Sequence, residues 1–464
     1  MVFSSLVFIS IFLPAVWGLY WLVPSEAGKN ALLLAASLLF YAYGEPVYVF
    51  LMVASAFLNY LCALFVQKGK SYRKSVLALA VILNLGILFV FKYAAFLIET
   101  INGITGLAFT VPRVALPVGI SFFTFQAMSY IIDVYRGEVQ AQRNFAYVLL
   151  YISLFPQLIA GPIVKYHDIE RKLVKREISM QDTAEGIHRF IVGLAKKVLI
   201  ANDMGIVADT LFQAPMENIN LFGAWLGAGA YMLQIYFDFS GYSDMAIGMG
   251  RMFGFQFKEN FNYPYVADSI QEFWRRWHIS LSGWFREYLY IPLGGNRKGK
   301  IRTCVNKFIV FACTGIWHGA NWTFLFWGLY HGCLLMFEEF TQIFHKECKG
   351  MKKLLRHLYV VLAVLVGFVF FRADDMHQGI CWVYKMCAGL QFHDVAMRLL
   401  LSLLTPGHIA VFIIGILASR PIIRRNWQET AASKIAWPVS VILLIVCMMN
   451  LAGGTYNPFI YFQF

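Results

Sequence analysis

Two histidines lie in an apolar, tryptophan-rich stretch at residues 313–332, which reads CTGIWHGANWTFLFWGLYHG. Ionisable side chains are costly in such surroundings, so His318 and His331 need an explanation. His318 stands beside Trp317, which can shape a pocket, and near Asn321, which offers a second polar group. The simpler alternative is a ring that only hydrogen-bonds a neighbouring carbonyl. We predict a reactive role for His318, with Asn321, His331 and Asp244 as supporting polar groups.

A second candidate segment, residues 271–292, reads QEFWRRWHISLSGWFREYLYIP and predicts an interfacial helix. Its arginines could simply reach out to lipid phosphates. They could also bind a phosphate-rich donor such as coenzyme A at the cytoplasmic face, since guanidinium groups suit phosphate. No Walker or GxGxxG motif competes for that role. The candidate phosphate ligands are Arg275, Arg276, Arg286, Arg297 and Lys298, with Lys300 and Arg302 close by in the sequence.

A third polar cluster, YFDFSGYSDMAIG at residues 236–248, places Asp238 and Asp244 in an apolar stretch. Such acids are most economically explained by a water-filled tunnel or a nearby arginine, and we favour structural pairing over catalysis. The sequence contains neither a GxSxG elbow nor an HExxH motif, so it offers no serine nucleophile and no zinc-hydrolase signature. We therefore predict no metal site.

These residues must be positioned by membrane helices. The chain is 59% hydrophobic and 14% charged, against about 25% charged residues in soluble proteins. Its apolar runs recur, which predicts an all-α polytopic membrane protein. The first run lacks a basic flank and is predicted to be a retained helix. The candidate spans are 2–22, 31–44, 47–66, 76–98, 115–132, 145–164, 187–201, 222–237, 304–318, 322–340, 357–372, 408–419 and 435–452.

The arrangement along the chain indicates one membrane domain, 1–464, because neither repeats nor low-complexity linkers interrupt it. Within it we expect a catalytic core at about 115–340 and an aromatic tail at 453–464. The stretches 145–164 and 222–249 mix glycine, proline and acids with apolar residues, which predicts re-entrant segments. The eight cysteines are scattered, so no disulfide framework is indicated.

The formal charge of +13 resides in short loops between apolar runs, which is typical of cytoplasmic loops and argues against nucleic acid as a partner. Basic loops at 67–74 and 345–356 are predicted to be cytoplasmic. Together with Arg420, Arg424 and Arg425, they place both termini outside the cytoplasm. This orientation requires that 373–407 lies along the outer face without crossing.

At these residues the chain resembles the membrane-bound O-acyltransferase (MBOAT) family, and within it the bacterial branch that modifies cell-surface polymers. The resemblance implies a ring of about 11 transmembrane helices, plus re-entrant and interfacial helices, around a central funnel. The motifs that carry it are LPVGISFFTFQAMSYIIDVYRG at 116–137, FPQLIAGPIVKY at 155–166, FDFSGYSDMAIGMGRMFGF at 237–255, ENFNYPY at 259–265, EFWRRWHISLSGWFREYLYIPLGGNR at 272–297, IWHGANWTFLFWGLYHG at 316–332, FFRA at 370–373 and FIYFQF at 459–464.

The resemblance also implies a site and a reaction. His318 matches the family's catalytic histidine, His278 matches an upstream polar partner, and His331 ranks second. The implied donor is acetyl-CoA, a substrate and not a bound cofactor. The implied acceptor is an extracytoplasmic polysaccharide such as alginate, peptidoglycan or cellulose, reached with a partner acetyltransferase. The implied location is the bacterial cytoplasmic (inner) membrane, with lipid as a further partner.

Our mechanistic hypothesis makes His318 the general base that takes a proton from an acceptor hydroxyl, while His278 or Asn321 orients or polarises. Tyr461 in the aromatic tail could accept the acyl group and pass it on. The alternative for this tail is an aromatic anchor at the membrane interface. Two other classes of function stay open: a transporter of the acyl donor or acceptor, and a scaffold without chemistry of its own.

Overall fold

The computed structural model describes residues 1–69, 71–112, 114–159, 161–341, 344, 348–421, 435–454, 456–458 and 460. Regular structure in these residues is helical, and they contain no strand. They form two compact units that each gather distant parts of the sequence. Unit 1 contains Met1–Val192, Tyr242–Glu259 and residues 435–440, and unit 2 contains Gly193–Gly241, the described residues of 260–421, and those of 441–460.

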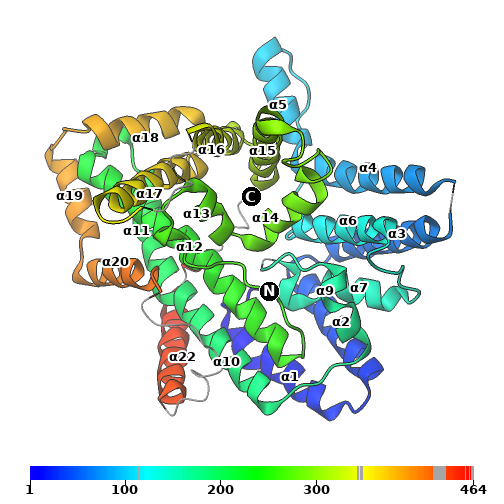
Figure 1. Ribbon diagram of the computed structural model, residues 1–464. Helices are drawn as coiled ribbons and strands as arrows, with labels where there is room; N and C mark the ends of the chain where they lie inside the picture. Colours follow the sequence, from blue (N-terminus) through cyan, green and yellow to red (C-terminus); the bar gives the residue numbers. More distant parts are fainter. Residues whose placement is uncertain are drawn as a thin grey trace. The chain divides into compact units, whose positions relative to one another are not determined.

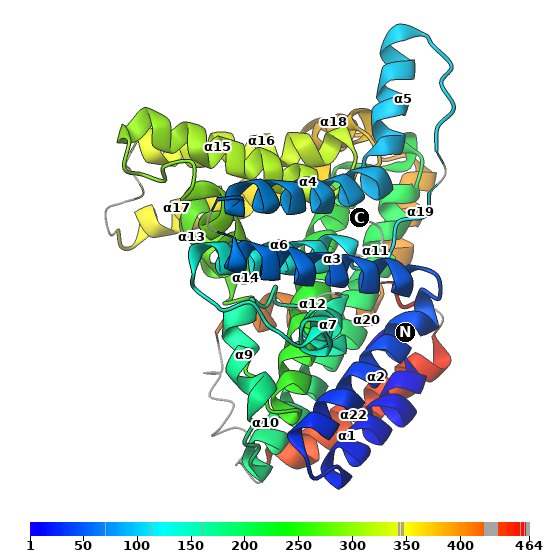
Figure 2. The same ribbon diagram turned by 90° about the vertical axis from the view of Figure 1, so that its right-hand side faces the viewer.

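Unit 1 begins with long apolar helices, and α3, α4 and α6 pack side by side (Figures 1 and 2). Asn59 of α3 and Asn84 of α4 exchange two amide hydrogen bonds, of 3.0 and 2.9 Å, which satisfies both buried side chains. The helices of this unit are η1 (Phe8–Phe12), α1 (Leu13–Leu22), α2 (Glu26–Gly44), α3 (Tyr48–Lys68), α4 (Arg73–Lys92), α5 (Ala94–Thr105), α6 (Ile120–Arg136), α7 (Phe145–Ser153), α8 (Phe155–Leu158), α9 (Tyr166–Val174) and most of α10 (Met180–Ala195).

Unit 2 contains both histidine segments. Its helices are η2 (Lys196–Ala201), α11 (Asn202–Gln213), η3 (Met216–Asn218), most of α12 (Leu221–Met252), η4 (Pro264–Val266), α13 (Ile270–Arg276), α14 (Ile279–Phe285), η5 (Arg286–Tyr290), α15 (Gly299–His318), α16 (Trp322–Thr341), α17 (Met351–Arg372), α18 (Met376–Ala388), α19 (Asp394–Leu403), α20 (Pro406–Ala418) and most of α22 (Ala436–Gly453). The helix α15 ends at His318 itself, because Gly319 adopts extended backbone.

The pair α15 and α16 is packed backbone to backbone. A Cβ atom at Gly315 would collide with the Phe324 carbonyl of α16, and one at Gly328 would collide with the Phe311 carbonyl of α15. Glycine is therefore required at both positions, as in membrane helix pairs that approach through small residues. This contact fixes the helix that carries His318 against its neighbour.

Four described helices are long and apolar enough to cross a membrane: α3, α4, α17 and α22. A fifth span is possible if α19 and α20, which meet at 65°, count as one broken span. The stretch 373–407, expected to lie flat on the outer face, thus contains α18 and α19, and α19 belongs to that bent pair. The chain is a multi-pass membrane protein, and the predicted ring of about 11 helices stays a prediction.

The predicted re-entrant segments have different outcomes. Residues 145–164 are indeed broken, because α7 ends at Ser153 and the four-residue α8 follows. Residues 222–249 instead belong to one continuous 32-residue helix, α12, so that prediction was wrong. The predicted interfacial helix at 271–292 is also wrong in detail: it consists of three short helices, with His278 at the break between the first two.

Candidate active site

A cavity of about 480 Å³ lies in unit 2 between two helical walls. One wall is the run α13, α14 and η5, and the other is one face of α15. Both predicted catalytic histidines, His278 and His318, line this cavity. Its volume falls in the range of small-molecule sites.

The two walls run in opposite directions. Along α14 the order is His278 and then Arg286, whereas along α15 it is Lys307 and then His318. The helix η5 contacts α15, and His278 and His318 both lie against the Trp317 indole, with ring centroids 6.2 and 5.0 Å away. His278 and His318 are therefore together at one end, and Arg286 and Lys307 are at the other. The eleven residue steps from Lys307 to His318 correspond to roughly 16 Å of helix.

His278 is held by a tight turn. Its backbone is left-handed, with φ of 45°, which is uncommon outside glycine. The segment around Asn260 fixes this turn: the Ile279 N–H donates to the Asn260 carbonyl at 2.9 Å, and the Asn262 N–H donates to the Arg276 carbonyl at 2.9 Å. The strained residue is therefore supported on both sides by main-chain hydrogen bonds.

The Asn260 side chain determines the tautomer of His278. Its Oδ1 accepts the Ser280 main-chain N–H at 3.2 Å, which identifies that atom as the oxygen. His278 Nδ1 lies 3.1 Å from the same Oδ1 and must therefore carry the proton. His278 Nε2 has no hydrogen-bond partner in the part of the chain that the structure describes. Because the side chain lines the cavity, the free Nε2 is a hydrogen-bond acceptor for a ligand.

Burial, and after it the charge on the neighbouring His318, hold the pKa of His278 well below its ordinary value of 6.5. His278 lies between α13 and α14, outside the candidate spans. It is therefore a neutral imidazole at physiological pH, with one nitrogen donating to Asn260 and the other available to accept.

His318 is buried in an aromatic cage at the C-terminal end of α15, with 5% of its surface exposed. The ring centroids of Trp317, Trp327 and Phe371 lie 5.0 to 5.2 Å from the ring centroid of His318. Aromatic walls exclude water, which strengthens any proton transfer or electrostatic contact made at this ring.

The three supporting residues have other surroundings. Asn321 caps α16 by accepting the Thr323 N–H at 3.1 Å, and it donates to the Asp374 carbonyl at 2.8 Å. His331, fully buried in α16, packs among Trp274, Trp327 and Tyr330 and does not line the cavity. Their predicted supporting roles stay predictions.

Asp244 belongs to unit 1, where Arg189 donates to its Oδ1 at 2.8 Å. Asp238, in unit 2, lies 2.8 Å from the Lys197 ammonium. Both acids thus have cationic partners, as structural pairing predicts, although the partner of Asp238 is a lysine. Asp244 and the two cavity histidines therefore belong to different units.

The predicted phosphate ligands divide into two groups. Arg275 and Arg286 line the cavity. Arg276 instead pairs with Glu272 at 2.6 Å, and Arg297 and Lys298 are exposed without lining it. Tyr461, the predicted acyl carrier, lies outside the described residues, as do Arg424 and Arg425.

Three lining or supporting residues were missed by sequence reasoning: Asn260, Lys307 and Thr314. Lys307 and Thr314 follow the helical spacing 307, 310, 311, 314, 318, which places them on the His318 face of α15. That spacing was available in the sequence. Asn260 offered only its position in ENFNYPY, because its contact with His278 depends on the chain turning back over 18 residues.

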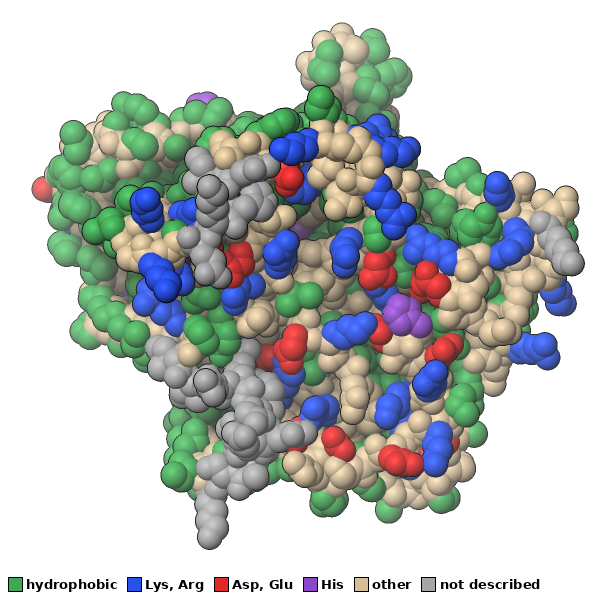
Figure 3. Space-filling model, in the orientation of Figure 1, with side chains coloured by type: hydrophobic (Ala, Val, Ile, Leu, Met, Phe, Trp, Pro, Cys, Tyr) green, Lys and Arg blue, Asp and Glu red, His purple; other side chains and the backbone are tan. Residues whose placement is uncertain are grey.

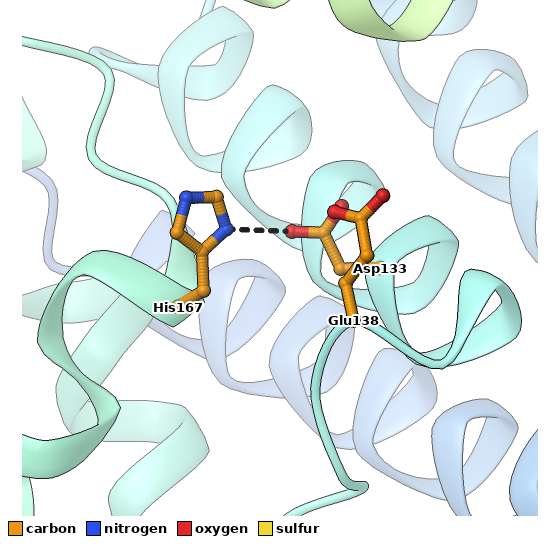
Figure 4. Close-up of side chains that lie close together, drawn as sticks. All are labelled: Asp133, Glu138 and His167. Carbon is orange, nitrogen blue, oxygen red and sulfur yellow. Dashed lines mark hydrogen bonds and ion pairs between the residues drawn. The ribbon is translucent and has the colours of Figure 1, made fainter.

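Unit 1 contains a separate charged cluster on α6 and α9. Asp133, Glu138 and His167 present ligand-type atoms within 4.8 Å of one another, and His167 Nδ1 lies 3.4 Å from Asp133 Oδ2 (Figure 4). The network continues through Asp168 to Lys258 at 2.6 Å. Figure 3 shows the same mixture of acidic and basic side chains over α9 and its surroundings. Ion pairs account for this cluster without a metal.

The fold and the cavity define a class: a multi-pass helical membrane protein with a buried histidine site. Residues 121–372 match the MBOAT family model, that of the membrane-bound O-acyltransferases. The match covers more than half of the chain, which therefore belongs to this family and is an O-acyltransferase. His318 and His278 both fall inside the matched range.

Three relatives make the comparison more specific. The chain is 39% identical to a probable alginate O-acetylase AlgI of Azotobacter vinelandii, over the full length of both proteins. It is 36% identical to a peptidoglycan O-acetyltransferase of Helicobacter pylori, over 82% of this chain and 78% of the relative. It is 29% identical to a teichoic acid D-alanyltransferase of Bacillus subtilis, over 60% and 69%.

Proposed function

We propose that this chain transfers an acetyl group from acetyl-CoA towards a hydroxyl group of a cell-surface polysaccharide. The observation that carries the proposal is the antiparallel pair of cavity walls, which separates a histidine end from a cationic end. Acetyl-CoA carries its thioester at one end of a long arm and its phosphates at the other. This layout matches the separation of roughly 16 Å along α15 between the histidine end and the cationic end. The cations at the phosphate end are Arg286 and Lys307, and Lys307 also pairs with Glu339 at 2.6 Å.

In the proposed reaction His318 removes the proton from the acceptor hydroxyl as the oxygen attacks the thioester carbonyl. The new C–O bond forms, the C–S bond breaks, and the thiolate of coenzyme A leaves with the proton from His318. The only hydrogen of that hydroxyl goes to His318, so the free Nε2 of His278 can instead accept a hydrogen bond from a neighbouring donor group of the ligand and so orient it. A buried site makes both interactions stronger than they are in water.

The acceptor class rests on the relatives. Those with alginate and peptidoglycan in their names are O-acetylating proteins, so an extracytoplasmic glycan is the acceptor we propose here. The proposal includes a bacterial inner-membrane location, a ring of about 11 helices, both termini outside the cytoplasm and a partner acetyltransferase that completes delivery. Tyr461 is the proposed carrier between donor and partner, through an ester on its phenolic oxygen.

The test expresses the parent chain, His318→Ala and His377→Ala in a host that lacks its own copy. His377 is an exposed histidine on α18 and serves as the matched control. After membrane levels are equalised, ester-linked acetate on purified surface glycans is measured. Loss only in His318→Ala supports the proposal and identifies the acceptor. Normal acetate in His318→Ala overturns it and leaves a scaffold or transporter.

A further inference from the structure

The last described part of the chain contacts a buried lysine–aspartate pair of unit 2. Lys197 in η2 and Asp238 in α12 have side chains that are each 2% exposed. Lys197 also donates to Asn202 Oδ1 at 2.8 Å and to the carbonyl of Pro458. The second oxygen of Asp238 accepts the Ile460 N–H at 2.9 Å. One ion pair therefore binds a main-chain acceptor and a main-chain donor of the C-terminal segment.

A second pair binds a side chain of the same segment. Tyr456 donates its phenolic hydrogen to Asp209 Oδ2 at 2.5 Å, and Arg372 holds the other oxygen of Asp209 at 2.7 Å. A Cβ atom at Gly205 would lie 2.7 Å from both the Tyr456 hydroxyl and Gln234 Nε2. The hydroxyl is thus held by a charged acceptor in a closely packed site.

These contacts satisfy groups that the helices alone do not. The Lys197 ammonium donates to Asn202 and to the Pro458 carbonyl, and it lies 2.8 Å from Asp238 Oδ1 as an ion pair. Without the segment, a buried lysine hydrogen and a buried carboxylate oxygen would lose these partners, which is unfavourable. Asp238 and Arg372 also come from the FDFSGYSD and FFRA motifs, which the cavity does not use.

We propose that Lys197, Asn202, Asp209 and Asp238 form a peptide-docking site whose ligand is the chain's own segment, residues 456–458 and 460. The Lys197–Asp238 pair contacts main chain, so it is indifferent to side chains, whereas Asp209 specifies tyrosine at position 456. Docking does not depend on the acyl-transfer reaction.

The test uses the full-length chain in native membranes and needs neither donor nor acceptor. Ile460 is 4% exposed, so a cysteine placed there should react slowly with N-ethylmaleimide. Gly453, exposed at the end of α22, gives the matched Gly453→Cys control, which should react fast. Labelling at each position is followed by peptide mass spectrometry, which separates it from labelling of the natural cysteines.

Two mild substitutions then probe the site. Tyr456→Phe removes one hydrogen bond to a charged group and should raise the labelling rate at position 460 by roughly 10-fold. Gly205→Ala should raise it similarly, because the added methyl group would crowd both the Tyr456 hydroxyl and the Gln234 amide.

His318→Ala should leave the labelling rate unchanged, which separates docking from catalysis. Equal labelling at positions 460 and 453 overturns the proposal. It is also overturned if both Tyr456→Phe and Gly205→Ala label at the parent rate.

Discussion

Two sets of buried polar residues, one in each unit, differ in whether their hydrogen-bonding atoms have partners. In unit 1, Asn59 pairs with Asn84, and Arg189 pairs with Asp244. In unit 2, His278 lines a cavity, and its Nε2 has no hydrogen-bond partner among the described residues. A closed pair stabilises the fold, whereas a buried acceptor that faces a cavity is available to a ligand. Burial alone therefore does not identify a catalytic residue.

The largest effect should come from the cavity. Replacing His318 by alanine removes the proposed general base, so the turnover rate per folded molecule should fall by about 10²–10⁴. Turnover is measured on detergent-purified protein with acetyl-CoA as the donor. The thermal unfolding midpoint should change little by comparison. A variant with near-parent turnover would place the proton transfer at another residue.

The converse is expected for the Arg189–Asp244 pair. Arg189→Met leaves a buried carboxylate without its guanidinium, which should cost about 3–5 kcal/mol of stability. Turnover per folded molecule should stay at the parent level. The double variant Arg189→Met with Asp244→Leu should recover most of the stability, as thermal unfolding in detergent would show. If turnover falls as far as in His318→Ala, Asp244 supports the reaction after all.

A smaller effect should follow from the cationic end of the cavity. Lys307→Met should raise the KM for the donor by about 10-fold, since one charge-assisted contact is worth roughly 1.5–3 kcal/mol. The value of kcat should hold, because this contact is made equally in the ground and transition states. Lys298→Met, at an exposed position that does not line the cavity, is the control and should leave KM unchanged.

The smallest effect concerns pH. The pKa of His278 is lowered in the folded chain, while the unfolded chain titrates near 6.5. Below pH 6.5 the unfolded state binds the extra proton, so stability is lost as pH falls, by at most about 1.4 kcal/mol per pH unit. In His278→Gln, the thermal unfolding midpoint should depend less on pH between pH 6.5 and 5.5 than it does in the parent chain. Parallel curves for parent and variant would show that His278 is not held neutral.

The sequence itself predicted His318, because ionisable groups in tryptophan-rich surroundings are rare enough to be informative, whereas the role of His278 came from the family resemblance. It failed on α12, where glycine was taken as a helix break. A Cβ at Gly248 would lie 2.6 Å from the Gly186 carbonyl, so that glycine serves close helix packing within unit 1. Local composition does not distinguish these two uses of glycine.

Ion-pair partners, one of them local and one distant in the sequence, explain the outcomes for Arg276 and Asp238. Arg276 and Arg286 look equivalent in the sequence, yet Glu272, four residues before Arg276, pairs with that arginine, whereas Arg286 faces the cavity. Asp238 was predicted to be paired, but nothing local could name Lys197 as its partner across 41 residues of chain. Side-chain type could be predicted as functional or structural, whereas partners depended on the fold.

The glycine contact between α15 and α16 has a consequence for how such enzymes diversify. Gly315 packs against Phe324 and Gly328 packs against Phe311, so the wall that carries His318 has no space for larger side chains where α15 crosses α16. The opposite wall is assembled from three short helices. Directed evolution towards a bulkier acyl donor should therefore accumulate its accepted substitutions in α13, α14 and η5, and hardly any at the α15–α16 crossing.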